Sequence, residues 1–205
     1  NILDSIVKHN RTCKEDEKLS VKEIAANCML FQVAGVDTSK SVVEFVLSDF
    51  AANKKNQSYF YDRISSKIPA AELESYSSYA DNELMKHFIK EALRLYSPTG
   101  LLFPRLVLKD TKVGKYTFRK GARYMVAFTQ LHFDEKYYKN AKSLDPERFV
   151  SQKQESSART SPACNMPFGL GKRSCIGRYL GELFVQIGLV SLTRSFEFKA
   201  LKDYQ

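Results

Sequence analysis

The residues best suited to chemistry lie in one short stretch, residues 167–178. Cys175 directly precedes an apolar helical pattern, Tyr179 to Thr193, so the positive end of a helix dipole and free backbone N–H groups favour its thiolate. Arg173 is a fixed cation suited to a carboxylate or phosphate, and the glycines let the backbone turn tightly and approach something flat. A sulfur anion beside an anion-binding cation suits a bound metal cofactor with acidic arms.

Competing motifs fail at specific positions of this stretch. A P-loop needs a glycine five residues before Gly171 and a Ser or Thr after the lysine, where Met166 and Arg173 stand. A dinucleotide-binding fingerprint needs a glycine at the position of Ser174. A zinc site needs paired ligands, and the sequence contains no C-x-x-C pair. A buried, inert cysteine, the usual fate of a lone Cys, stays open as an alternative.

The stretch resembles the haem-binding loop of the cytochrome P-450 family, the haem-thiolate monooxygenases. The match is complete at the five positions of the family pattern, which are Phe168, Gly171, Arg173, Cys175 and Gly177. The resemblance implies haem b as the cofactor, with the Cys175 thiolate as axial iron ligand that promotes O–O cleavage. The residues implied in haem binding are Phe168, Gly169, Arg173, Cys175 and Gly177, with Arg173 neutralising a haem propionate.

A long helix is predicted from about residue 20 to residue 52. Ser20 and Glu23 form a capping box at its start, and about 30 helical residues span roughly 45–50 Å. Residues 34–39 compete for backbone hydrogen bonds inside it, so they are either a tolerated weak spot or a distortion that opens a groove. By resemblance, this segment crosses the distal haem face, where Asp37 and Thr38 support proton delivery to bound dioxygen.

A second helix is predicted from about residue 81 to residue 96. It carries Glu91 and Arg94, which share a helix face at i, i+3 and can pair. The simplest interpretation is an exposed ion pair of little energetic weight. The resemblance implies instead a buried pair of the family's E-x-x-R helix, completed by Arg148 from a meander at about residues 134–160.

Residues 101–130 are predicted to form short strands, namely 101–108, 116–118 and 124–128. Arg105 stands where family members direct an arginine to a haem propionate, although a surface arginine at a strand edge is an open alternative. We interpret His132 as structural and not as a metal ligand. A final helix is expected over residues 176–194, followed by a strand-like alternation at residues 196–198.

Composition limits the class of protein. The chain has 205 residues and is 43% hydrophobic, with 14 Phe and 11 Tyr, which suffices for a core. The net charge of +9 favours acidic partners, but no nucleic-acid-binding module is recognisable. The four cysteines show no disulfide framework, so a reducing compartment is the default. No apolar run reaches the ~18 residues of a membrane span.

These observations predict a mainly α fold with small β-sheets, in which residues 1–205 are the C-terminal portion of a single cytochrome P-450 domain. The resemblance implies a monooxygenase that inserts one oxygen atom of O2 into a small apolar organic substrate. It also implies an NADPH-dependent reductase or other electron donor on the Cys175 side. An N-terminal segment upstream of the chain would anchor the full-length protein to the cytoplasmic face of the endoplasmic reticulum membrane.

Two alternatives stay open at this point. A haem-thiolate isomerase or dehydratase would share the cysteine loop, expected at residues 167–177, but would need no protonation of dioxygen. The Asp37 and Thr38 pair argues against it. A truncated, non-enzymatic product that binds no haem is the second alternative.

Overall fold

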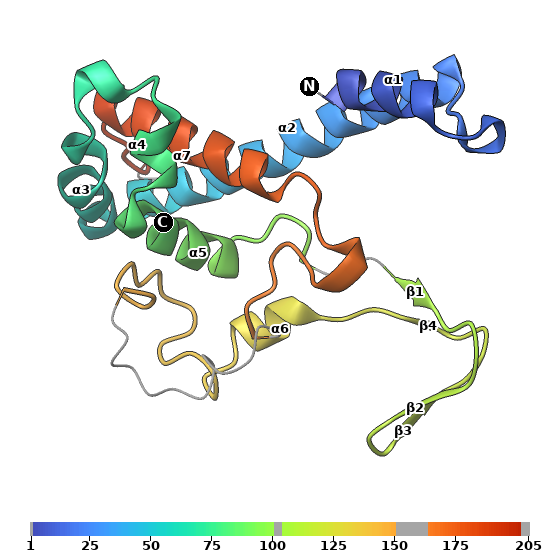
Figure 1. Cartoon of the computed structure of the whole chain (residues 1–205). Helices are drawn as coiled ribbons and strands as arrows, with labels where there is room; N and C mark the ends of the chain where they lie inside the picture. The colour runs from blue at the N-terminus through green and yellow to red at the C-terminus, as the bar shows by residue number, and fades with distance from the viewer. Residues whose placement is uncertain (1, 101–103, 151–163, 202–205) are drawn as a thin grey trace.

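The computed structural model describes residues 2–100, 104–150 and 164–201, and it is mainly helical with two small antiparallel sheets. The helices are α1 Ile2–Thr12, α2 Val21–Ala52, α3 Lys54–Arg63, α4 Tyr76–Ala80, α5 Glu83–Leu95, α6 Phe128–His132 and α7 Arg178–Ser195 (Figure 1). Strand β1 Arg105–Leu106 pairs with β4 Arg123–Tyr124, and β2 Thr111–Val113 pairs with β3 Tyr116–Phe118. The predicted fold class is therefore confirmed.

The long helix α2 starts at the predicted capping box. Ser20 Oγ accepts a hydrogen bond from the Glu23 backbone N–H at 3.3 Å, and the Glu23 carboxylate accepts one from the Ser20 N–H at 2.8 Å. Of the two alternatives for residues 34–39, the structure has the tolerated weak spot and not the distortion, because α-helix runs without interruption from Val21 to Ala52. The Thr38 hydroxyl donates to the Ala34 carbonyl at 2.7 Å, a bond that a helix accommodates without opening.

The main core lies where the C-terminal half of α2 meets α3, α5 and α7. The rings of Phe50, Phe60 and Phe88 come from α2, α3 and α5, and their centroids lie 4.7–6.0 Å apart. All three side chains are fully buried. Their packing joins the three helices into the scaffold that supports the rest of the chain.

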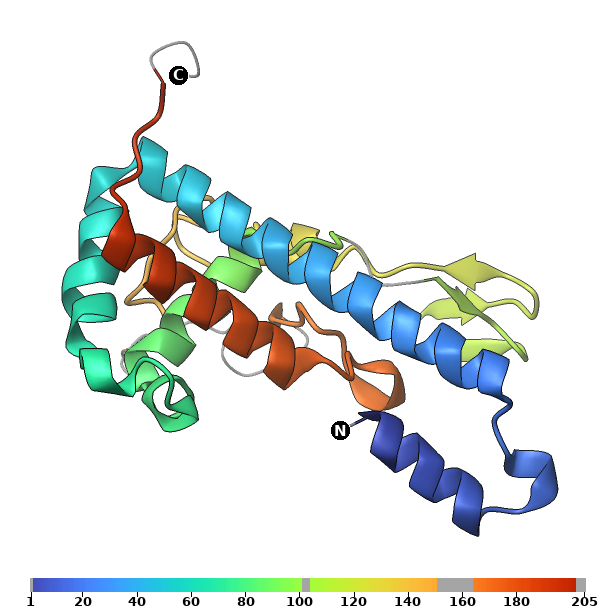
Figure 2. The ribbon, with the colours of Figure 1, turned by 90° about the horizontal axis from the view of Figure 1, so that it is seen from above.

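Helices α2 and α7 lie side by side in both views (Figure 2). Two glycines of α7 face α2, and a Cβ there would make ordinary van der Waals contacts, at 3.4 Å with Val43 Cγ2 for Gly188 and at 3.7 Å with Ser39 Oγ for Gly181. Gly181 is near the N-terminus of α7, so the loop that precedes α7 is held close to the middle of α2.

Two strand predictions need correction, and one strand was missed. The strand expected up to Phe128 is wrong, since Phe128 begins α6 and is buried there. Strand β2 was not predicted, and it pairs with β3 through a turn at Gly114. The alternating pattern at residues 196–198 forms no strand in the described chain, because the Gln57 side chain bonds the Phe198 N–H at 2.8 Å and its carbonyl at 3.0 Å. Residues 101–103 of the first predicted strand lie outside the described residues.

One helical stretch in the described residues, Glu15–Ala52, is long and apolar enough to cross a membrane by length and composition. The sequence prediction missed it because its apolar residues do not form a continuous run. Val42, Val46 and Phe50 of the same helix are core residues, whereas no residue of the apolar window that meets this criterion is buried in the structure.

Candidate functional site

The cysteine loop, residues 167–177, is shaped by two glycines and by backbone hydrogen bonds, one of which joins the Ser174 N–H to the Gly171 carbonyl at 3.0 Å. Gly169 and Gly171 have φ angles of 71° and 73°, a left-handed conformation that glycine adopts without strain. The Gly169 N–H donates to the Met166 carbonyl at 3.0 Å, and the Cys175 N–H donates to the Phe168 carbonyl at 2.8 Å. The second bond closes the loop, so Cys175 is held directly before the first turn of α7.

Cys175 lies on an open stretch that carries apolar and basic side chains, because Lys172 and Arg173 are exposed as well. Cys175 is exposed and is not in a disulfide, and the neighbouring side chains of Leu170, Ile176 and Leu180 are 51%, 82% and 53% exposed. A Cβ at Gly171 would meet no atom within 4 Å. The inert, buried cysteine considered from the sequence is therefore wrong for Cys175.

This surface fits a flat apolar macrocycle that carries its own metal. Arg173 is exposed two residues before Cys175, where its guanidinium can pair with an acidic arm. In the described part of the chain, no three His, Cys, Asp or Glu side chains gather into a metal site. Haem iron can be held by a single cysteine of the protein, and Cys175 offers an exposed thiol at this surface.

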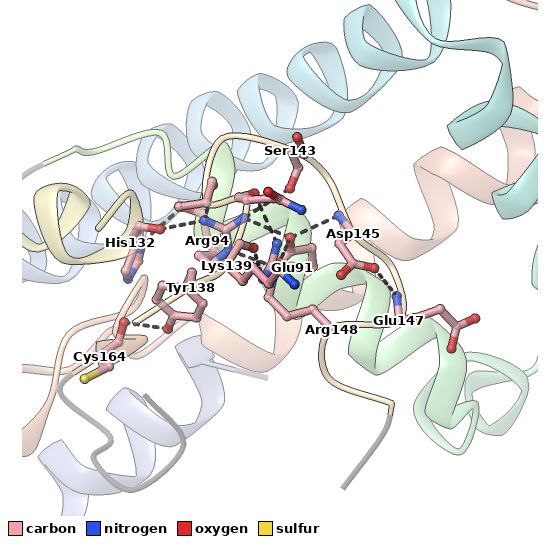
Figure 3. A network of polar contacts seen from close by, with 12 residues as sticks. Glu91, Arg94, His132, Tyr138, Lys139, Ser143, Asp145, Glu147, Arg148 and Cys164 are labelled. Carbon is pink, nitrogen blue, oxygen red and sulfur yellow. Dashed lines mark hydrogen bonds and ion pairs between the residues drawn. The ribbon is translucent and has the colours of Figure 1, made fainter. Parts of the chain in front are cut away.

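Glu91, Arg94 and Arg148 form a buried ion cluster, which we call the Glu91 cluster (Figure 3). Arg94 makes two parallel bonds of 2.8 Å to the Glu91 carboxylate, and Arg148 Nε lies 2.9 Å from Glu91 Oε1. The side chains of Glu91 and Arg94 are 0% exposed, and that of Arg148 is 7% exposed. The exposed-pair interpretation is wrong, and the buried triad implied by the family resemblance is present.

The cluster also bonds backbone carbonyls of His132, the last residue of α6, and of the segment that follows it. Arg94 Nη1 donates to the carbonyls of His132 and Ala141, both at 2.6 Å, and Arg148 Nη1 donates to the Lys139 carbonyl at 2.8 Å. Buried charges are tolerated when their hydrogen bonds are satisfied in this way. The two arginines thereby join α5 to residues 132–148.

His132 extends these contacts to the residues before the cysteine loop. It is fully buried, with Nδ1 3.0 Å from the Arg94 carbonyl and Nε2 3.3 Å from the Met166 N–H. A carbonyl only accepts and an N–H only donates, so His132 is the neutral tautomer with its proton on Nδ1. Burial lowers the pKa of His132 to about 4, in agreement with a neutral ring. Sequence reasoning found the structural role but not the contact with Met166.

The remaining candidates lie apart from this network. Asp37 is exposed on α2, next to the half-buried Thr38 whose hydroxyl bonds Ala34. Arg105 lies in β1, is half-buried, and donates from Nη1 to the Pro104 carbonyl at 3.3 Å. The roles expected for these three residues stay predictions.

A groove lies between α5 and α7 and is lined in part by Phe168, Gly169 and Leu170 of the cysteine loop. Its lining residues include Lys90, Phe168, Arg178 and Leu183, but not Cys175. We therefore do not assign this groove to the cofactor.

Comparison with known proteins gives a consistent result. The sequence model of a family described as "Cytochrome P450" matches residues 1–205. Over 91% of its length the chain is 30% identical to cytochrome P450 3A15 of Cavia porcellus, and over its full length it is 29% identical to cytochrome P450 3A17 of the same species. It is 28% identical over 97% of its length to human cytochrome P450 3A5. The chain spans 36% to 40% of the length of these three relatives.

Proposed function

The chain belongs to the cytochrome P450 family, and from this premise we propose that the intact protein is a haem-thiolate monooxygenase. The observation that carries the proposal is the accessible Cys175 thiol on a glycine-shaped loop, with Arg173 beside it and apolar side chains around it. The family's cofactor is haem b, which supplies the activation of dioxygen when it is bound.

The cofactor is held mainly by the cysteine loop. Cys175 Sγ would ligate the haem iron, and the lack of side chains at Gly169 and Gly177 would leave room for a flat group to approach the backbone. Phe168 contributes an aromatic side chain on the same loop. Arg173 pairs with a propionate, and Arg105 pairs with the other one.

Proton delivery is proposed for the middle of α2. The Thr38 hydroxyl has a single proton, which it donates to the Ala34 carbonyl at 2.7 Å. Its lone pairs remain able to accept a hydrogen bond from water, so Thr38 Oγ1 would hold a proton-donating water in place. Asp37 is exposed one position earlier, where a carboxylate can exchange protons with solvent and pass them to that water.

Electrons are proposed to arrive from an NADPH-dependent reductase or another electron donor on the Cys175 side. Four lysines that follow α6 or lie on the cysteine loop are exposed, namely Lys136, Lys139, Lys142 and Lys172. Positive charge of this kind attracts an acidic partner and speeds encounter. No nucleic acid is proposed as a partner.

The substrate is proposed to be a small, apolar organic molecule that reacts with O2. The site of action is the cytoplasmic face of the endoplasmic reticulum membrane, with attachment through a segment upstream of residue 1. This localisation rests on the family membership, and it can be checked by fractionation of cells that express the full-length protein.

Isotope labelling tests the reaction class. The full-length protein, a reductase and NADPH are incubated with a panel of small apolar compounds under ¹⁸O2. We expect products that carry one ¹⁸O atom each, with the second atom released as water. Turnover that consumes no O2 and gives unlabelled products would establish the isomerase or dehydratase alternative instead. A full-length protein that incorporates no haem would establish the non-enzymatic alternative.

A further inference from the structure

We propose that His132 and Tyr138 are positioning residues for Cys175. They connect the Glu91 cluster to residues 164–166, which we call the entry segment because it leads into the cysteine loop. The connection fixes the geometry in which the Cys175 thiolate can ligate iron, so this inference rests on the proposed haem-thiolate function for the purpose of the loop.

The entry segment is attached to the scaffold at two points that are two residues apart. The Tyr138 hydroxyl donates to the Cys164 carbonyl at 2.7 Å, and the Met166 N–H donates to His132 Nε2 at 3.3 Å. All four residues are buried, with exposures of 0% to 8%. Because one bond uses a carbonyl and the other an N–H, the two attachments fix the direction of the backbone as well as its place.

From Met166 the hydrogen bonds continue to the cysteine. The Met166 carbonyl accepts from the Gly169 N–H at 3.0 Å, and the Phe168 carbonyl accepts from the Cys175 N–H at 2.8 Å. Met166, which is bonded to His132, therefore begins the first turn of the loop. That turn contains Phe168, whose carbonyl accepts the bond from Cys175. A shift of Met166 would be transmitted to Cys175 through these two bonds.

At its other end the connection is anchored by Arg94, as Figure 3 shows. The Arg94 guanidinium donates to the His132 carbonyl at 2.6 Å, and the Arg94 carbonyl bonds His132 Nδ1 at 3.0 Å. The guanidinium carbons of Arg94 and Arg148 lie 4.9 Å and 5.9 Å from the Tyr138 ring centroid. Both positioning side chains are thus held by the Glu91 cluster itself.

Burial requires hydrogen-bonding side chains at positions 132 and 138. The Met166 N–H and the Cys164 carbonyl would be left without partners in the described structure if His132 and Tyr138 became apolar, and a buried backbone group without a partner is costly. A leucine at 132 or a phenylalanine at 138 fills space but bonds neither group. Glutamine at 132 retains one donor and one acceptor, so it can replace both bonds of the imidazole.

The test compares Tyr138→Phe and His132→Leu with Tyr79→Phe in the full-length protein. Tyr79 is a matched control, because it is 1% exposed and its hydroxyl also donates to a backbone carbonyl, that of Leu73, at 2.8 Å. Amide hydrogen exchange of peptides from residues 164–176 is measured together with the Soret band of the reduced, carbon monoxide-treated protein. His132→Gln is the rescuing variant.

We expect Tyr138→Phe and His132→Leu to accelerate exchange at residues 164–176 by about fivefold, the factor that a net hydrogen bond of about 1 kcal/mol gives. The thiolate-type band should shrink in both variants, while Tyr79→Phe should change neither readout. His132→Gln should recover the band. If the two test variants match Tyr79→Phe in both readouts while the wild-type protein shows the band, the positioning role is refuted. Absence of the band from the wild-type protein would refute the proposed function instead.

Discussion

Replacing Glu91 with alanine leaves two buried guanidinium groups without their counter-charge. The Glu91 carboxylate accepts bonds of 2.8 Å from Arg94 and 2.9 Å from Arg148, and the side chains of Glu91 and Arg94 are 0% exposed. The variant raises the net charge of the Glu91 cluster from +1 to +2. Removing one partner of a buried pair costs about 3–5 kcal/mol, a large share of the roughly 5–15 kcal/mol that stabilises a typical domain.

Two further variants provide stability losses with which that of Glu91→Ala can be compared. Arg148→Met leaves the neutral Glu91–Arg94 pair, so it should destabilise the protein less than Glu91→Ala does. Glu83→Ala is the matched control on the same helix, since Glu83 pairs with Lys86 at i, i+3 and 2.6 Å but both side chains are exposed. It should leave stability unchanged, as expected for an exposed pair.

The assay is urea unfolding of the full-length proteins, with haem content measured from absorbance. A lower midpoint at constant slope reports a loss of stability. We expect the midpoint and the haem content to fall in the order Glu83→Ala, Arg148→Met, Glu91→Ala. If Glu91→Ala is insoluble, Glu91→Gln takes its place in the series. Equal midpoints for the Glu91 and Glu83 variants, or a larger loss for Arg148→Met than for Glu91→Ala, would refute the reasoning from buried net charge.

Three more predictions concern other parts of the site. Thr38→Ala should preserve folding and haem content but yield less product and more hydrogen peroxide per NADPH consumed, because it removes the Oγ1 acceptor proposed to hold water. An unchanged ratio of product to NADPH would show that the Thr38 hydroxyl serves only its hydrogen bond to Ala34 within the helix. Changing Lys172 and Lys139 to Glu should slow reduction at low salt and weaken its salt dependence, whereas unchanged stopped-flow kinetics would remove these lysines from the docking surface. Burial lowers the pKa of His132 from 6.5 to about 4. Between these pH values the unfolded chain binds a proton that the folded chain excludes, so the free energy of unfolding falls as the pH falls from 6.5 toward 4. Above pH 6.5 His132 is neutral in both states, and this loss of stability is absent. Between these pH values the wild-type protein should lose up to about 3 kcal/mol more than His132→Gln in urea unfolding, and equal losses would contradict this assignment.

Local patterns predicted the long helices well. The start of α2 at Val21 depends on a capping box within four residues, and α5 and α7 depend on apolar periodicity and on their flanking residues. Such signals depend only on residues within one turn or one helix, so they can be recognised in the sequence before the packing is known. Composition left a distortion at residues 34–39 open, and the structure excludes it, because Thr38 bonds back to Ala34 within an uninterrupted helix.

Burial could not be predicted from spacing alone. Glu83 with Lys86 and Glu91 with Arg94 have the same i, i+3 spacing on one helix, yet the first pair is exposed and the second is buried. The difference depends on Arg148, which lies 57 residues after Glu91. Only the resemblance to a family supplied that third residue.

The connection to the cysteine loop could not be predicted either. His132 and Met166 are 34 residues apart, and a backbone N–H can belong to any residue type, so the contact has no sequence signature. Phe128 illustrates the opposite error, because an apolar residue next to a strand-like pattern became the buried first residue of α6. Tertiary packing overrode the local preference in this case.

The central claim is that Cys175 is the iron ligand, and one spectrum tests it directly. The full-length wild-type protein, reduced and treated with carbon monoxide, should show the red-shifted Soret band of a thiolate-ligated haem. Cys175→Ala should abolish this band, whereas Cys164→Ala should retain it, because Cys164 is buried and bonds Tyr138 only through its backbone carbonyl. Loss of the band in Cys164→Ala together with its survival in Cys175→Ala would contradict the account.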